Sequence, residues 1–228
     1  MIVINNVTFC YEKQNVLEHI KIEFEENSIH GIVGLNGSGK TTFFNLLSGF
    51  IEPDEGTISF NGQSIKKQDI AYIDVESFFY PKLTAKEFLS VLPKSNSNFK
   101  EDELALLFNL PLDEFIENYS TGMKKKLLIL SQLKQDKQIY IFDEPFNGLD
   151  VESNMSLQII IELLNKKNKT VFISSHIIEP LYTICHKIHH LKDKTFVKSY
   201  LPCDYKLIEN EVFGHFTEQL KNKLSQSI

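Results

Sequence analysis

The sequence predicts an α/β fold: a mixed core with an antiparallel β subdomain and an inserted helical subdomain. Strands of alternating polarity fill residues 1–30, and such alternation is typical of an antiparallel sheet with one face in water. The apolar strand Ile29–Val33 then leads through a glycine-rich turn into an apolar helix start. Helical periodicity follows over about 84–131, and from Ile139 the pattern returns to strand, helix and strand.

Two local signals mark element boundaries within this pattern. The pair Asn61-Gly62 closes a predicted strand in the way that is typical of a tight hairpin turn. Thr84 and Glu87 match the capping-box pattern, which predicts a helix that begins directly after Thr84.

We expect a single domain, 1–228, because its length is ordinary for one domain and no linker or repeat interrupts it. Within it, about 76–131 is predicted to form a loop and the helical subdomain, and about 201–228 a short C-terminal tail. Apolar residues of the tail recur at helical spacing, so we expect them to pack on the protein's own core: Val212, Phe213, Phe216, Leu220 and Leu224.

Composition narrows the possible partners and compartments. A formal net charge of −6 argues against a nucleic-acid partner, for which a basic surface is expected. No apolar run approaches the ~20 residues that a membrane helix needs, and three scattered cysteines form no disulfide framework. We therefore expect a cytoplasmic protein that meets a membrane only through a partner.

The turn after Ile29–Val33 has the sequence of a phosphate-binding loop. Glycines let successive backbone N–H groups turn toward a phosphate, and the following helix start adds its positive dipole end. Lys40 would reach the terminal phosphates, and the Thr41 hydroxyl would bind Mg²⁺. The sequence thus predicts a nucleoside triphosphate site at Gly34, Leu35, Asn36, Gly37, Ser38, Gly39, Lys40, Thr41 and Thr42.

A second group of candidates follows later in the chain. A short hydrophobic strand ends in Asp143 and Glu144; Asp143 can hold the Mg²⁺ shell while Glu144 polarises a water as general base. Between this strand and the phosphate loop, small residues open another helix that is suited to an anion: Ser120, Thr121, Gly122 and Met123.

This ordered set resembles the nucleotide-binding domain of ATP-binding cassette (ABC) proteins over about residues 1–200. The resemblance implies ATP and Mg²⁺ as cofactors, with 34–42 as the Walker A loop and 138–144 as Walker B. Residues 119–123 match the family signature, although Thr121 and Met123 depart from its commonest form. It further implies an adenine-stacking aromatic at Tyr11, a D-loop aspartate at Asp150 and a switch histidine at His176.

The resemblance also implies partners. Two such domains would pair head to tail, and the second domain would be either a copy of this chain or a different chain. The pair would drive separately encoded membrane permease subunits. The signature resembles that of bacterial exporters, and the aromatic run 78–80 follows the loop where a permease helix docks. Equally, those aromatics would fill a joint between subdomains. The alternative function is a soluble ABC-type ATPase, for instance in iron–sulfur assembly.

All 24 basic residues are lysines, so the chain contains no arginine. Many NTPases use an arginine finger, worth roughly 10³ to 10⁵ in rate, to stabilise transition-state charge. The resemblance implies a substitute, in which the Ser120 hydroxyl and the N–H groups at Gly122 close over the γ-phosphate of the facing domain.

Three further positions are interpreted from the sequence. The resemblance places Val75 where the family has a loop glutamine that contacts Mg²⁺ or water. Either Asp74 or Glu76 takes its role, or the site works without it, and Glu76 is the better candidate because a shift of one residue is easy in a loop. Lys124-Lys125-Lys126 is interpreted as a solvated helix face. The cluster of Cys185, His186, His189 and His190 matches no usual zinc spacing, so we interpret it as structural.

Overall fold

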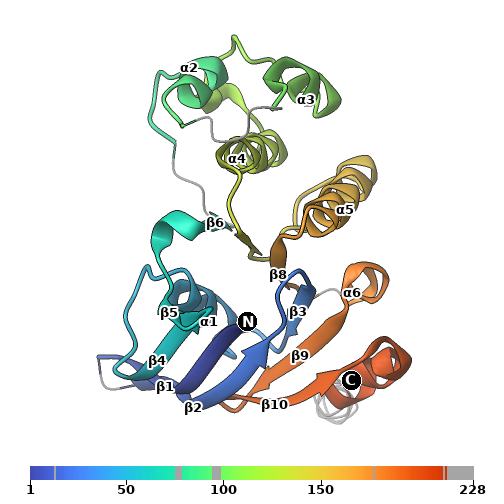
Figure 1. Ribbon diagram of the computed structural model, residues 1–228. Coiled ribbons are helices and arrows are strands. Elements are labelled where there is room, and N and C mark those ends of the chain that lie inside the picture. Colours follow the sequence, from blue (N-terminus) through green and yellow to red (C-terminus); the bar gives the residue numbers. More distant parts are fainter. Residues whose placement is uncertain (13, 75–78, 94–98, 177, 213, 215–228) are drawn as a thin grey trace, which may run out of the picture.

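The computed structural model contains two sheets joined by helices (Figure 1). It describes all residues except 13, 75–78, 94–98, 177, 213 and 215–228. The strands are β1 Ile2–Tyr11, β2 Gln14–Phe24, β3 Ile29–Val33, β4 Glu55–Phe60, β5 Gln63–Ser64, β6 Ile70–Ile73, β7 Ile139–Phe142, β8 Thr170–Ser174, β9 Lys187–Lys192 and β10 Thr195–Tyr200. The α-helices are α1 Lys40–Leu47, α2 Ala85–Ser90, α3 Glu101–Leu107, α4 Thr121–Gln135, α5 Val151–Lys166 and α6 Glu179–Ile184.

Each of the two sheets corresponds to one part of the predicted fold, the antiparallel subdomain or the core. The four-stranded sheet, ordered β2-β1-β4-β5, is antiparallel throughout. In the six-stranded sheet, ordered β10-β9-β3-β8-β7-β6, the strands from β9 to β6 are parallel. Because parallel strands share a direction, the carboxyl ends of β3, β8 and β7 lie along one edge, where ligands of α/β proteins bind. The predicted fold class is confirmed.

Two hydrophobic clusters hold these layers together. One lies between the sheets and α1, and it includes Phe24, Phe44 and Phe172. The other covers the opposite face of the six-stranded sheet with α4, α5 and α6, and it includes Tyr140, Leu127 and Ile161. The inner strands β3, β7 and β8 therefore bury both faces, which explains their largely apolar sequences.

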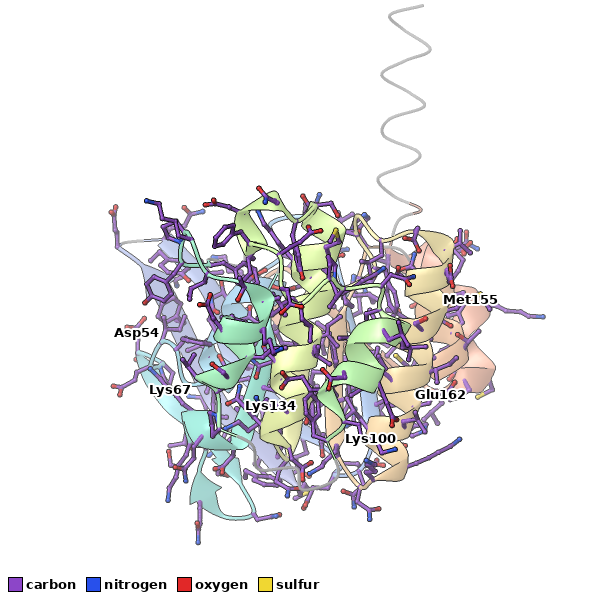
Figure 2. All side chains as sticks on the ribbon, turned by 90° about the horizontal axis from the view of Figure 1, so that it is seen from above. Asp54, Lys67, Lys100, Lys134, Met155 and Glu162 are labelled. Carbon is purple, nitrogen blue, oxygen red and sulfur yellow. The ribbon has the colours of Figure 1, made fainter. Side chains whose placement is uncertain are left out.

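The helical segment stands apart from the β subdomain in Figure 1, with α2, α3 and α4 grouped above the sheets. The predicted capping box is present: the Thr84 hydroxyl accepts a bond from the Glu87 N–H, and Glu87 accepts one from the Thr84 N–H. Lys134 joins the three helices, because its buried ammonium donates to the Leu89 carbonyl at 2.6 Å and to Glu101 at 3.0 Å. Figure 2 shows Lys134 on α4 in the middle of this face.

The ends of the predicted segments are partly described. Beyond the predicted helical segment, α4 continues to Gln135, where Asp136 caps it in a left-handed conformation. Residues 205–212 are helical. Their Ile208 and Val212 side chains are buried in the hydrophobic cluster that includes α4, α5 and α6. The tail residues Phe213, Phe216, Leu220 and Leu224 lie outside the described part. No helix of the described chain is long and apolar enough to cross a bilayer.

The capping box yields a prediction for stability. Thr84→Ala removes the acceptor for the Glu87 N–H and should lower the free energy of unfolding by about 1 kcal/mol. Thr84→Ser keeps the hydroxyl and should stay close to the original protein. Urea unfolding monitored by circular dichroism measures both; equal stability of the alanine and serine variants would contradict the assignment.

Candidate nucleotide site

The phosphate loop is shaped by backbone rather than by side chains. Gly39 precedes α1 with φ of 101°, and no side chain caps the helix. Its first N–H groups are therefore left for an anion, since the first turn also contains no acidic residue. Gly34 is required by a close approach: a Cβ there would lie 2.4 Å from the Leu191 carbonyl oxygen.

Lys40 lies inside this loop with only 7% of its surface exposed. Its ammonium donates to the carbonyl oxygens of Gly34 at 2.9 Å and Leu35 at 3.3 Å. The Glu144 carboxylate is 3.9 Å away. Burial lowers the pKa of Lys40, while Glu144 and Asp143 oppose that shift. The loop thus encloses a cation beside the predicted general base.

The Asp143 carboxylate accepts hydrogen bonds from hydroxyl groups on three elements. The carboxylate is 1% exposed, and its Oδ2 accepts from the Thr41 hydroxyl at 2.7 Å and from the Tyr72 hydroxyl at 3.3 Å. Ser174, at the end of β8, donates to the other oxygen. Thr41 and Asp143 are predicted from the sequence, whereas Tyr72 and Ser174 belong to no recognised motif. Only the position of Ser174 at a strand end was a usable signal.

Glu144, which follows Asp143 after the end of β7, adopts a left-handed backbone with φ of 46°. Its N–H donates to the Ser174 hydroxyl at 2.8 Å. The side chain turns toward His176, whose Nδ1 lies 2.8 Å from Oε2 and whose N–H donates to the same oxygen at 3.2 Å. The structure therefore brings Glu144, His176, Lys40 and Asp143 together at one edge of the sheet.

The signature residues lie at the start of α4. Ser120 caps α4 by accepting the Met123 N–H, and Thr121 and Ser120 are exposed. A Cβ on Gly122 would lie 3.4 Å from the Gly148 carbonyl oxygen, so the helix start adjoins the loop before Asp150. Asp150 in turn caps α5 through the Ser153 N–H. In Figure 1 α4 and α1 occupy different parts of the molecule.

The remaining predicted positions are Tyr11, the loop at 75–76 and the lysine run 124–126. Tyr11 ends β1, is 46% exposed and meets the Phe9 ring edge-on at 4.8 Å. Glu76 and Val75 lie outside the described residues, so the replacement of the loop glutamine by Glu76 stays a prediction. The solvated face predicted for 124–126 is wrong for Lys125, which is 7% exposed because it bonds to the loop that follows β7.

The geometry fits Mg-ATP. Thr41 and Asp143 provide hydroxyl and carboxylate oxygens within 2.7 Å of each other, the hard ligands that Mg²⁺ prefers. Among the described residues, the buried Ser38 hydroxyl has no hydrogen-bond partner, as expected of a loop that closes around a phosphate. The Lys40 ammonium, the Glu144 carboxylate near it and the uncapped N–H groups of α1 are the kinds of group that phosphoryl transfer requires.

Comparisons with known proteins agree with this geometry. The family model described as ABC transporter matches residues 17–147. The ABC transporter ATP-binding protein YtrB of Bacillus subtilis is 30% identical over 204 residues, covering 86% of this chain and 70% of YtrB. The bacitracin transport ATP-binding protein BcrA of Bacillus licheniformis is 29% identical, covering 96% and 75%.

A solved ATP-binding subunit of an ABC transporter superposes with a TM-score of 0.83 at 26% identity, covering 99% of both chains. Fold, motif order and relatives point the same way. The chain belongs to the ABC transporter family, as an ATP-binding subunit that hydrolyses ATP.

Proposed function

We propose that this chain binds Mg-ATP at residues 34–42 and hydrolyses it in a head-to-tail dimer of nucleotide-binding domains that drives a membrane permease. The observation that carries the proposal is the convergence of Lys40, Asp143, Glu144 and His176 at the carboxyl edge of parallel strands. These groups come from widely separated parts of the sequence.

Each group has a role that its contacts support. Lys40 meets the terminal phosphates, and the Thr41 and Asp143 oxygens hold Mg²⁺, which would neutralise charge on the phosphates. Glu144 accepts a proton from the attacking water, and His176 holds the carboxylate through its 2.8 Å contact. Tyr11 stacks on adenine with its exposed ring.

The dimer follows from what one chain lacks. No arginine is present to stabilise transition-state charge. The exposed N-terminus of α4, with Ser120, Thr121, Gly122 and Met123, instead covers the γ-phosphate held by the facing domain, and Asp150 lies at the same interface. Hydrogen-bond donors that are fixed in advance act strongly in such a water-excluded site.

The membrane partner is supported by relatives and by one exposed aromatic. The two named relatives are subunits of transporters, and one carries a bacitracin transport name, which favours an exporter over a soluble ATPase. Phe79 packs edge-on against Phe88 at 5.2 Å, whereas Tyr80 is 69% exposed. We assign Tyr80 to the permease dock, which would hold the protein at the inner face of the membrane.

Glu144→Gln should leave ATP binding intact and lower turnover by a factor on the order of 10² or more, because the general base is lost. Lys40→Ala should instead abolish tight ATP binding. Equilibrium binding of a fluorescent ATP analogue and steady-state phosphate release separate the two effects. Normal turnover by Glu144→Gln would overturn the assignment.

A mixture of Lys40→Ala and Ser120→Arg chains should regain about one working site per mixed dimer, because each variant spoils a different half of the shared site. Turnover per molecule of the original protein should also rise with its concentration. ATPase assays measure the activity regained by the mixture and the concentration dependence of turnover, and light scattering measures the oligomeric state. A constant rate per molecule in a demonstrably monomeric sample would refute the shared site.

Affinity purification of the tagged chain from detergent-solubilised membranes should retain a polytopic subunit encoded in the same cells. Tyr80→Ala should reduce the amount retained several-fold, because an exposed aromatic anchor is lost, while ATPase activity of the purified chain is unchanged. Phe50 is another exposed aromatic residue, with 58% of its surface exposed, so Phe50→Ala is the matched control. Recovery of the chain from cytosol alone would favour the soluble ATPase.

A further inference from the structure

Lys125 links the signature helix to the catalytic loop within one chain. It lies in the second turn of α4, and its ammonium donates to the Glu144 carbonyl oxygen at 2.9 Å and to the Asn147 carbonyl oxygen at 3.0 Å. The side chain is 7% exposed. A buried lysine of this kind is costly unless its donors are satisfied, so these two bonds hold α4 and the loop together.

The loop that Lys125 holds has an unusual backbone. Glu144 has φ of 46° and Gly148 has φ of 72°, and a left-handed conformation is strained at a residue other than glycine. Such a conformation persists only where surrounding contacts enforce it. For Glu144, Ser174 holds the N–H at 2.8 Å and Lys125 holds the carbonyl oxygen at 2.9 Å.

Charge adds to this connection. Burial lowers the pKa of Lys125, while Glu144 and Asp143 favour its charged form. An ammonium donates more strongly than a neutral group to a carbonyl oxygen. Lys125 therefore combines a hydrogen bond to the Glu144 backbone with a favourable field from the two carboxylates.

We propose that Lys125 is a positioning residue, which aligns the Glu144 carboxylate with the site by clamping its backbone to α4. The inference rests on the proposed function, in which Glu144 is the general base. Because α4 also presents Ser120 to the facing domain, seating of the signature in one site and alignment of the base in the other would depend on the same helix. Lys125 would thus couple the two sites of a dimer.

The test compares Lys125→Met, which keeps the length and removes the donors, with Lys124→Met on the same helix. We expect Lys125→Met to lower kcat roughly 10-fold with KM for ATP changed less than about twofold, since small displacements of a catalytic group have effects of this order. Lys124→Met should retain kcat. Lys125→Gln, which restores amide donors on a shorter side chain, should regain part of the loss.

A double variant separates positioning from general destabilisation. If Lys125 acts through the Glu144 carboxylate, Lys125→Met should not slow the Glu144→Gln protein further, so the two effects are not additive. The inference is overturned if Lys125→Met keeps the original kcat, if it raises KM as strongly as it lowers kcat, or if it slows both backgrounds by the same factor. Should Lys125→Met not fold by circular dichroism, Lys125→Gln replaces it, with a smaller loss of kcat expected and again no further slowing of the Glu144→Gln protein; an unchanged kcat of Lys125→Gln would then overturn the inference.

Measuring Glu144→Gln alone distinguishes the two possible failures. Normal turnover by that variant refutes the proposed function. A slow Glu144→Gln together with a fully active Lys125→Met refutes only the positioning role.

Discussion

The nucleotide site depends on the need to satisfy one buried carboxylate. Asp143 is 1% exposed and lies at the end of a central strand. A buried charge without partners is strongly unfavourable, and here the hydroxyl groups of Thr41, Tyr72 and Ser174 supply them. Those groups belong to α1, β6 and β8, so the interaction that satisfies Asp143 also aligns the phosphate loop with the catalytic edge of the sheet.

The two hydrophobic clusters explain why the site is precise on one side and incomplete on the other. The six-stranded sheet is packed on both faces, which fixes the ends of β3, β7 and β8 and the groups they carry. The N-terminus of α4, in contrast, stays exposed. Ser120 and Thr121 are exposed there, although Ser120 caps the Met123 N–H, and an accessible helix start is suited to an anion brought by another molecule. This exposure agrees with the proposed sharing of catalysis between two domains.

The absence of arginine gives this arrangement its chemical reason. Backbone and hydroxyl donors do not carry a full charge, so they must be fixed in place before the reaction to be effective. Lysines provide such fixation at two places: Lys134 joins the helices of the helical segment, and Lys125 joins α4 to the loop after β7. Lys125 bonds to two backbone carbonyl oxygens, whereas Lys134 bonds to one and to the Glu101 carboxylate.

Local sequence patterns predict the fold class, the phosphate loop, the strand before Asp143 and Glu144, and the capping box at Thr84, because the spacing of each pattern has a direct physical cause. Which side chains satisfy Asp143, and that Lys125 is buried, became clear only from the folded chain. Tyr72 and Ser174 are ordinary residues of strands, and Lys125 is the middle member of a lysine run. Their partners are far away in the sequence, and no local pattern records which distant group will face a buried carboxylate or carbonyl oxygen.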